Sequence, residues 1–176
     1  YVGRAMMDPA EVTIAELLRA ADYHTGIYGK WHLGDNYPMR PMDQGFEDSL
    51  IHRGGGIGQP SDPIGAEGKY TDPTLLKNGI ETPMKGYCTD IYFDGAMDFI
   101  ESTVKRKENF FTYIATNAPH GPYHDVPEKL YQEYLKVDFR PILINKKISS
   151  ARLKSETDKL ARICAMITNI DENVGR

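Results

Sequence analysis

The stretch "TGIYGKWHLG", residues 25–34, decides the fold, because it joins a predicted strand to a loop that carries reactive side chains. Residues 24–28 form a short run with apolar and β-branched members, which predicts a β-strand. The loop that follows contains Lys30 and His32, one residue apart, with a glycine at either end. The sequence therefore holds an ammonium group and an imidazole together, directly after a strand.

A second predicted strand ends in a similar way. "FFTYIAT", residues 110–116, is aromatic and β-branched, and it runs directly into "NAPHGP", residues 117–122, where His120 stands between two prolines. Apolar spacing over residues 89–105 predicts a helix between the two strands. Strands that alternate with helices indicate an α/β protein with a mainly parallel sheet flanked by helices.

The candidate residues fall at one edge of this expected sheet. In open α/β sheets, ligands bind beyond the carboxyl ends of the strands. Lys30, His32 and His120 all follow a predicted strand, so we expect them to converge there. Because each must reach one small oxyanion or its bonded oxygen, their side-chain ends should lie within about 10 Å of one another.

Other elements are predicted from local signals. A helix start is predicted at "DPAE", with Asp8 as the N-cap and a proline at the first helical position. The apolar residues after it fall on one face at helical spacing: Ile14, Leu17, Leu18 and Ala21. A short helix is predicted over residues 127–135, and a final helix from about Ser155, with Asp158 in the capping-box position. Residues 34–86 are rich in Gly, Pro and Asp, which predicts long loops with one short hairpin.

The composition excludes some classes of partner. The 176 residues contain 21 Lys and Arg against 25 Asp and Glu, a formal net charge of −4. This mild acidity argues against nucleic-acid binding, which needs a basic face, but leaves room for a local cationic pocket. No apolar run approaches the roughly 18 residues of a membrane span. The two cysteines, Cys88 and Cys164, are interpreted as buried thiols, with a single disulfide or a nucleophile as the alternatives.

The candidate side chains suit a tetrahedral oxyanion. Lys30 is a compact cation with three donors, fit for sulfate or phosphate, and the alternative is a surface lysine on a tight turn. His32 would be a hydrogen-bond donor, a proton shuttle or a metal ligand, or else a structural histidine. The prolines around His120 stiffen its loop, which suits a catalytic group, and His124 would line the same pocket. The remaining histidines are interpreted as solvent-exposed or packing residues: His24 and His52.

No set of residues forms a metal site by itself. His120 and His124 have the spacing of two zinc ligands on a helix, but Gly121 and Pro122 break any helix there. The glycine run over residues 54–58 lacks the signature of a phosphate loop. The sequence therefore predicts no metal ligands within this chain.

Longer segments resemble one known family. "TIAELLRAADYHTGIYGKWHLG" resembles the second signature region of the sulfatases, the arylsulfatase-like sulfuric ester hydrolases of the alkaline phosphatase superfamily. "RPMDQGFEDSLIHRGGGIGQ" resembles the Gly-Phe segment that follows in that family, and "NFFTYIATNAPHGPYHDVPEKLYQEY" resembles its strand and PH-x-P loop. "MITNIDENVGR" resembles a later helix. The resemblance implies an alkaline-phosphatase-like fold and the hydrolysis of a sulfate ester to an alcohol and sulfate.

The resemblance also implies roles for single residues. Lys30 corresponds to the family's sulfate-binding lysine, and His32 to the histidine beside the aldehyde nucleophile. His120 corresponds to the histidine that contacts the leaving-group oxygen and can protonate it. His124 is taken as a further substrate-binding residue. These roles agree with the chemistry of a cation for the oxyanion and imidazoles for proton transfer.

Parts of the family's machinery have no counterpart in this sequence. The family uses Ca²⁺ and a formylglycine made from Cys or Ser in a C/S-x-P/A-x-R motif, and neither Cys88 nor Cys164 stands in such a motif. The calcium-binding aspartates would precede Tyr1, and further calcium ligands with a second lysine would follow Arg176. Residues 1–176 are therefore predicted to be the middle of a sulfatase catalytic domain, with an incomplete sheet and no activity alone.

Two other functions stay open at this stage. One is a phosphate or phosphonate ester hydrolase of the same superfamily, and the other is a catalytically inactive binding module of the same fold. The expected partner is a small-molecule or glycan sulfate ester, with no nucleic acid and no membrane span. The resemblance implies a periplasmic, extracellular or lysosomal-type compartment, and the sequence carries no signal for an oligomeric state.

Overall fold

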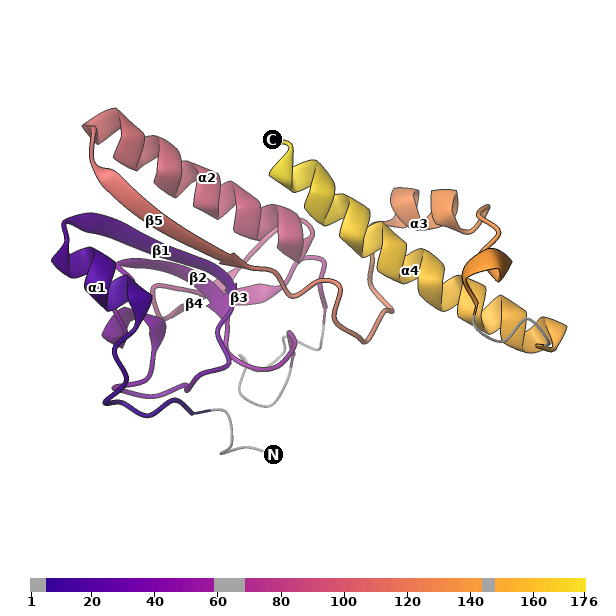
Figure 1. The fold of residues 1–176 in the computed structure, drawn as a ribbon, viewed down its shortest axis with the longest axis horizontal. Helices are drawn as coiled ribbons and strands as arrows, with labels where there is room; N and C mark the ends of the chain where they lie inside the picture. The colour runs from indigo at the N-terminus through magenta and orange to yellow at the C-terminus, as the bar shows by residue number, and fades with distance from the viewer. Residues whose placement is uncertain (1–5, 59–68, 144–147) are drawn as a thin grey trace. The chain divides into compact units, whose positions relative to one another are not determined.

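A computed structural model of the chain describes residues 6–58, 69–143 and 148–176. Within these residues lie five strands and four helices (Figure 1). The strands are β1 (Tyr23–Lys30), β2 (Asp48–His52), β3 (Thr74–Lys77), β4 (Ile80–Pro83) and β5 (Asn109–Ala115). The helices are α1 (Ile14–Ala20), α2 (Cys88–Arg106), α3 (Glu128–Tyr134) and α4 (Ser150–Val174), with short 3-10 turns at η1 (Pro41–Asp43) and η2 (Arg140–Ile142).

The chain divides into two compact units, Tyr1–Asn117 and Ala118–Arg176. The first unit holds all five described strands together with α1 and α2, and the second holds α3 and α4. No helix in the described parts of the chain is both long and apolar enough to cross a membrane.

The sheet has the strand order β4-β3-β2-β1-β5. β1 pairs in parallel with β2 on one side and with β5 on the other. This confirms the α/β class and the prediction that the strands around residues 25–28 and 110–116 are parallel neighbours. The sheet is mixed, because β3 pairs antiparallel with both β2 and β4. The β3–β4 pair is the short hairpin expected within residues 34–86, whereas β2 was not predicted.

The two faces of the sheet are covered by different helices. Successive strand residues point to opposite faces. On one face Ile27 joins a buried cluster with Ala15 of α1, Trp31 and Phe46. On the other face Tyr28 packs against Phe99 of α2, with ring centroids 6.2 Å apart. The sheet is therefore a central layer between α1 and α2 (Figure 1).

The start of α1 differs from the prediction. Its N-cap is Thr13, whose hydroxyl accepts from the Glu16 backbone N–H at 3.2 Å while the Glu16 carboxylate accepts from the Thr13 N–H at 2.8 Å. Asp8 instead closes a separate turn by accepting from the Ala10 N–H at 3.0 Å. The predicted cap was wrong because two capping signals lie five residues apart, and the complete capping box outcompetes the single acid.

The predicted apolar face of α1 was also wrong. Ile14 and Leu17 are 57% and 58% exposed, and the only buried residue of this helix is Ala15. The reason is close packing against Gly45, since a Cβ at Gly45 would lie 2.4 Å from the Glu16 backbone nitrogen. The helix therefore approaches the sheet through its smallest side chain and turns its larger ones outward.

The final helix begins earlier than predicted. α4 starts at Ser150, and the Ser149 hydroxyl caps it by accepting from the Arg152 N–H at 3.3 Å. Asp158 is therefore not a capping residue. It lies inside the helix, where its carboxylate accepts from Arg162 Nε at 3.0 Å and from the hydroxyl of Tyr131 on α3. These contacts join α3 to α4 within the second unit.

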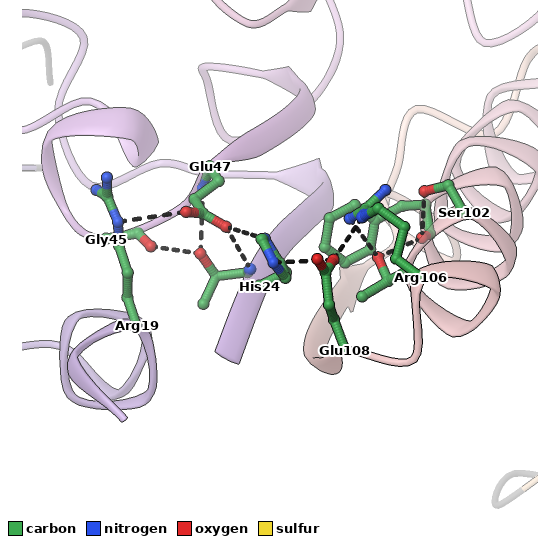
Figure 2. A network of polar contacts seen from close by, with 10 residues as sticks. Arg19, His24, Gly45, Glu47, Ser102, Arg106 and Glu108 are labelled. Carbon is green, nitrogen blue, oxygen red and sulfur yellow. Dashed lines mark hydrogen bonds and ion pairs between the residues drawn. The ribbon is translucent and has the colours of Figure 1, made fainter. Parts of the chain in front are cut away.

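His24 belongs to a surface network at the amino end of the sheet (Figure 2). Its Nδ1 lies 2.9 Å from Glu47 Oε2 and its Nε2 lies 3.0 Å from Glu108 Oε2. Arg19 of α1 reaches Glu47 at 3.5 Å, and Arg106 of α2 pairs with Glu108. The network ties β1 to the residues that precede β2 and β5. His24 is thus a structural residue, as the sequence indicated.

Asp48, the first residue of β2, anchors a second network. Tyr28 donates its hydroxyl to Asp48 Oδ2 at 2.6 Å, and Lys77 and Asn78 donate to the same carboxylate at 2.8 to 3.0 Å. Burial acts to raise the pKa of Asp48, but these hydrogen bonds outweigh it and hold the pKa below its ordinary value. Burial and the Asp48 hydrogen bond raise the pKa of Tyr28, so its phenol remains a donor.

Candidate active site

Lys30 is the last residue of β1 and stands at the carboxyl end of a strand that is hydrogen-bonded on both sides. Its side chain is half-buried, and Nζ donates to the carbonyl of Gly55 at 2.9 Å. Gly55 lies in a buried glycine run that follows β2. One carbonyl therefore holds the ammonium group at the ligand edge of the sheet. An ammonium has three donors, so two more remain for an anion.

The loop after Lys30 is fixed by its backbone. Trp31 N–H donates to the His52 carbonyl at 3.1 Å, and His32 N–H donates to the Arg53 carbonyl at 2.9 Å. The parallel pairing of β1 and β2 thus continues for two residues beyond the strands. His32 has a φ of 56°, which ends the extended run, and its side chain is exposed.

Trp31 packs beneath this loop. Its side chain is 7% exposed, and its ring lies edge-on to Phe46 with centroids 6.1 Å apart. The indole N–H donates to the carbonyls of Gly34 at 3.0 Å and Met39 at 2.9 Å. The interpretation of Trp31 as a packing residue with a hydrogen-bonded indole is confirmed. The indole N–H thus holds both ends of the segment 34–39 by hydrogen bonds.

Gly29 allows β1 and β5 to meet at this edge. Its φ is +122°, and a Cβ built at this position would lie 1.9 Å from the carbonyl oxygen of Ala115. No side chain fits there without separating the strands. The glycine before Lys30 is therefore a requirement of the backbone geometry.

His120 and His124 lie in the second unit, and both are exposed. His120 Nδ1 contacts the carbonyl of Gly121. His124 lines an open pocket of about 360 Å³ with Tyr123, Asp158, Lys159 and Arg162. Because these histidines and Lys30 belong to different units, their convergence stays a prediction.

Arg162 shapes the pocket beside His124. Its Nη1 donates to the Tyr123 carbonyl at 3.0 Å, and its guanidinium lies over the Tyr131 ring, 4.3 Å from the centroid. Hydrogen bonds from Tyr131 and Arg162 lower the pKa of Asp158, which therefore stays ionised at neutral pH. Asp158 and Arg162 neutralise each other, so Lys159 supplies the remaining positive charge of the pocket.

The structure adds site residues that the sequence patterns missed. Gly55 was not predicted as the partner of Lys30, and Arg53 was not linked to His32. Asn117, two residues after the end of β5, is 3% exposed, and its amide oxygen and nitrogen have no hydrogen-bond partner among the described residues. A polar residue at the end of a strand was the available signal for Asn117. Its buried amide requires a ligand, water or further chain as partner.

His52 and the cysteines have structural settings. His52 is buried, with Nδ1 2.8 Å from the Tyr92 hydroxyl, which confirms it as a packing residue. Cys88 is buried, as interpreted from the sequence, whereas Cys164 is only half-buried, and neither forms a disulfide in the structure. Burial raises the pKa of the Cys164 thiol, which opposes a role as a nucleophile.

The described residues do not supply a calcium site. Across residues 6–58, 69–143 and 148–176, no three His, Cys, Asp or Glu side chains gather in an arrangement that would hold a metal ion. The formylglycine motif is also absent from the sequence. The described residues therefore do not fit Ca²⁺, and the sequence does not fit a formylglycine.

Comparison with known proteins identifies similar chains. The family model described as Sulfatase matches residues 8–176. An arylsulfatase of Klebsiella aerogenes is 33% identical over 113 residues, which cover 62% of this chain and 24% of that protein. An N-acetylglucosamine-6-O-sulfatase of Bacteroides thetaiotaomicron is 33% identical over 118 residues, which cover 67% of this chain and 18% of that protein.

A solved structure supports the same likeness. The crystal structure of Ps i-CgsB aligns with a TM-score of 0.72 at 26% identity, over 98% of this chain and 37% of that one. The chain thus spans about a quarter or less of the two curated relatives and over a third of this structure.

Proposed function

This chain belongs to the sulfatase family, and on that premise we propose that the protein hydrolyses sulfate esters and that Lys30 binds the sulfate group. The observation that carries the proposal is the position of the Lys30 ammonium, held by the Gly55 carbonyl at the carboxyl end of a central strand. A cation fixed in advance binds an oxyanion without further reorganisation, and it stabilises charge that develops on the sulfate oxygens.

The histidines are proposed to move protons. His120 protonates the alcohol oxygen as it leaves, which is the role of a general acid. His32 holds or transfers a proton on the nucleophile side of the sulfate. His124 contacts the part of the substrate that carries the leaving oxygen. No step is assigned to calcium or formylglycine, because their residues are not in this chain.

The proposed substrate is a sulfated sugar, and residues 1–176 are proposed to be the middle of the catalytic domain. The B. thetaiotaomicron relative is named for an amino-sugar sulfate, and Ps i-CgsB has been crystallised with k-i-k-neocarrahexaose. These names support a glycan sulfate ester for this protein. The family also supports a compartment outside the cytoplasm, either periplasmic, extracellular or lysosomal.

The test compares two esters and three variants of the full-length protein. We expect turnover of 4-nitrophenyl sulfate to exceed that of 4-nitrophenyl phosphate. Lys30→Ala and His120→Ala should each lower kcat/KM for the sulfate by about 10²-fold or more, the scale of a lost oxyanion donor or general acid. Lys129→Ala is the matched control, because Lys129 is an exposed lysine on α3.

Three results would contradict the proposal. Faster hydrolysis of the phosphate ester would favour the phosphate or phosphonate hydrolase. Sulfate turnover by Lys30→Ala at the level of Lys129→Ala would show that Lys30 does not bind the reacting group. No turnover of either ester, by full-length protein with its nucleophile matured and calcium present, would favour the inactive binding module.

A further inference from the structure

The face of the sheet that carries Lys30 is the one packed against α2. Tyr28 and Leu50 are register partners on β1 and β2, and both approach Gly95 of α2. A Cβ built at Gly95 would lie 3.1 Å from Tyr28 Cδ1 and 3.3 Å from Leu50 Cδ2. Lys30 and His52 are also register partners, two residues further along each strand. Because side chains alternate along a strand, both of them face α2 as well.

The first turns of α2 lie at the carboxyl end of these strands. Tyr92, Gly95 and Phe99 follow one another at helical spacing on the side of α2 that meets the sheet. Phe99 packs on Tyr28, and Tyr92 packs on His52 with ring centroids 6.0 Å apart. Since His52 is the last residue of β2, the helix begins at the ligand edge of the sheet (Figure 1).

A buried hydrogen bond joins α2 to the end of β2. Nδ1 of His52 lies 2.8 Å from the Tyr92 hydroxyl. His52 is 1% exposed and Tyr92 is fully buried. A hydrogen bond that is closed to water is stronger than one at the surface, and it restrains the side chains that form it. The contact therefore fastens the carboxyl end of β2 to α2.

This end of β2 also holds the Lys30 segment at two points. The His52 carbonyl accepts from the Trp31 N–H at 3.1 Å. The Gly55 carbonyl, three residues further along, accepts from Lys30 Nζ at 2.9 Å. The position of the ammonium group therefore depends on where residues 52–55 lie, and His52 attaches those residues to α2.

We propose that Tyr92 and His52 are positioning residues for sulfate binding. Their hydrogen bond holds the Gly55 carbonyl in place, and through that carbonyl it holds the Lys30 ammonium where an oxyanion binds. This inference rests on the proposed function, because it concerns the sulfate that Lys30 is proposed to bind. Lysine has a flexible four-carbon stem, so its ammonium is preorganised only if the group that accepts from it stays fixed.

The polar character of the pair goes beyond what packing requires. A buried polar group costs free energy unless it is hydrogen-bonded, so an apolar residue would pack on α2 at lower cost. One register step earlier, the β2 residue that faces α2 is the apolar Leu50. The imidazole and the phenol thus meet at the register step that carries Lys30, where the exact position of the strand end matters.

The first test needs no activity. Amide hydrogen exchange is compared between the full-length protein and its Tyr92→Phe variant, which keeps the ring on His52 and removes only the hydroxyl. We expect exchange at residues 53–56 to be faster by about threefold or more, because one hydrogen bond that restrains this segment is lost. Equal exchange at residues 53–56 in the two proteins would overturn the proposal.

Tyr28→Phe is the matched control for this test. Tyr28 is also fully buried against α2, but its hydroxyl donates to Asp48 at the amino end of β2. The variant removes the same atom from the same face of the sheet at the opposite end of the strand. Exchange at residues 53–56 should therefore match the wild type, and acceleration equal to that of Tyr92→Phe would show only a general loss of stability.

The second test is a double-mutant cycle. The kcat/KM for 4-nitrophenyl sulfate is measured for full-length wild type, Tyr92→Phe, Lys30→Ala and the double variant. Tyr92→Phe alone should lower kcat/KM by about three- to tenfold, the size of one lost hydrogen bond. In the Lys30→Ala background it should have no effect, because no ammonium is left to position. The same loss in both backgrounds would indicate a structural role and contradict the proposal.

Two variants of His52 test whether its polar atom matters. Asparagine can place a hydrogen-bonding atom near the position of Nδ1, whereas leucine fills the space without one. His52→Asn should therefore keep most of the wild-type kcat/KM, and His52→Leu should lose as much as Tyr92→Phe. Equal losses in the two His52 variants would show that the hydrogen bond to Tyr92 does not position Lys30.

The two proposals fail in distinguishable ways. If the full-length protein does not hydrolyse 4-nitrophenyl sulfate, the proposed function fails, and exchange at residues 53–56 decides whether Tyr92 holds the Gly55 segment. If the ester is hydrolysed but the Tyr92 and Lys30 substitutions act independently, the proposed function stands and the positioning role fails.

Discussion

Replacement of Gly29 by alanine tests whether the candidate site depends on close contact between β1 and β5. The added Cβ would lie 1.9 Å from the Ala115 carbonyl oxygen, far inside van der Waals contact, at a φ of +122°. The backbone conformation alone costs roughly 1–3 kcal/mol for a residue with a side chain. Moving Ala115 away also weakens one or two hydrogen bonds of the β1–β5 ladder, at about 0.5–1.5 kcal/mol each. We therefore expect Gly29→Ala to destabilise the protein by about 2–6 kcal/mol, above the typical effect of one substitution.

The control for this prediction is Gly86→Ala. Gly86 also has a positive φ, +106°, but the nearest atom to its built Cβ is Ile91 Cγ1 at 3.9 Å. This variant has the backbone strain without the collision, so it should lose only about 1–3 kcal/mol. The free energy of unfolding of each variant is to be measured by urea denaturation of the purified protein, monitored by circular dichroism. Equal losses for the two variants would refute the argument that strand contact at Gly29 sets the edge beside Lys30.

Three further predictions concern the Asp48 network, the loop beneath the site and the isolated chain. Asp48→Asn should lower the free energy of unfolding at neutral pH. Because the folded-state pKa of Asp48 is depressed, its stabilising contribution is complete above the unfolded pKa and disappears as the pH falls through the folded one. The stabilities of wild type and variant should therefore begin to converge as the pH falls below about 5 and meet only below the folded-state pKa; a constant difference in acid titrations would contradict this. Trp31→Phe keeps a ring against Phe46 but removes the donor to two carbonyls, so residues 34–39 should exchange amide hydrogens faster, and unchanged exchange would show that the indole does not hold the loop. Residues 1–176 expressed alone should not hydrolyse 4-nitrophenyl sulfate, since they lack the nucleophile motif; calcium-dependent turnover by this chain would mean that the nucleophile lies within it.

Elements with a strong local pattern were predictable from the sequence. The strands around residues 25–28 and 110–116, and the helix around residues 89–105, agree with β1, β5 and α2 to within two residues at each end. The first residues of α1 and α4 were not predictable, because more than one Ser, Thr or Asp lies near the start of each helix and any of these residues can serve as the N-cap. Which residue caps depends on where the helix packs, and Gly45 decides that for α1.

The positions of Lys30 and His32 in the fold were more predictable than their contacts. Lys30 and His32 were placed at a sheet edge because a strand precedes them directly. Gly55, the partner of Lys30, depends on the register between β1 and β2, which local patterns do not encode. β2 itself was missed because "DSLIH" is only five residues long and begins with an aspartate, so its strand signal is weak.

β2 and the residues that follow it support the neighbouring Lys30 loop through backbone atoms. The carbonyls of His52 and Arg53 accept from the Trp31 and His32 N–H groups, and the Gly55 carbonyl accepts from Lys30 Nζ. Substitution of the β2 residues before His52 changes side chains but leaves these carbonyls in place. Those side chains can therefore vary while the contacts of the Lys30 loop are kept. On this argument, the position of the Lys30 ammonium depends on the register between β1 and β2 rather than on the side chains of β2 that precede His52.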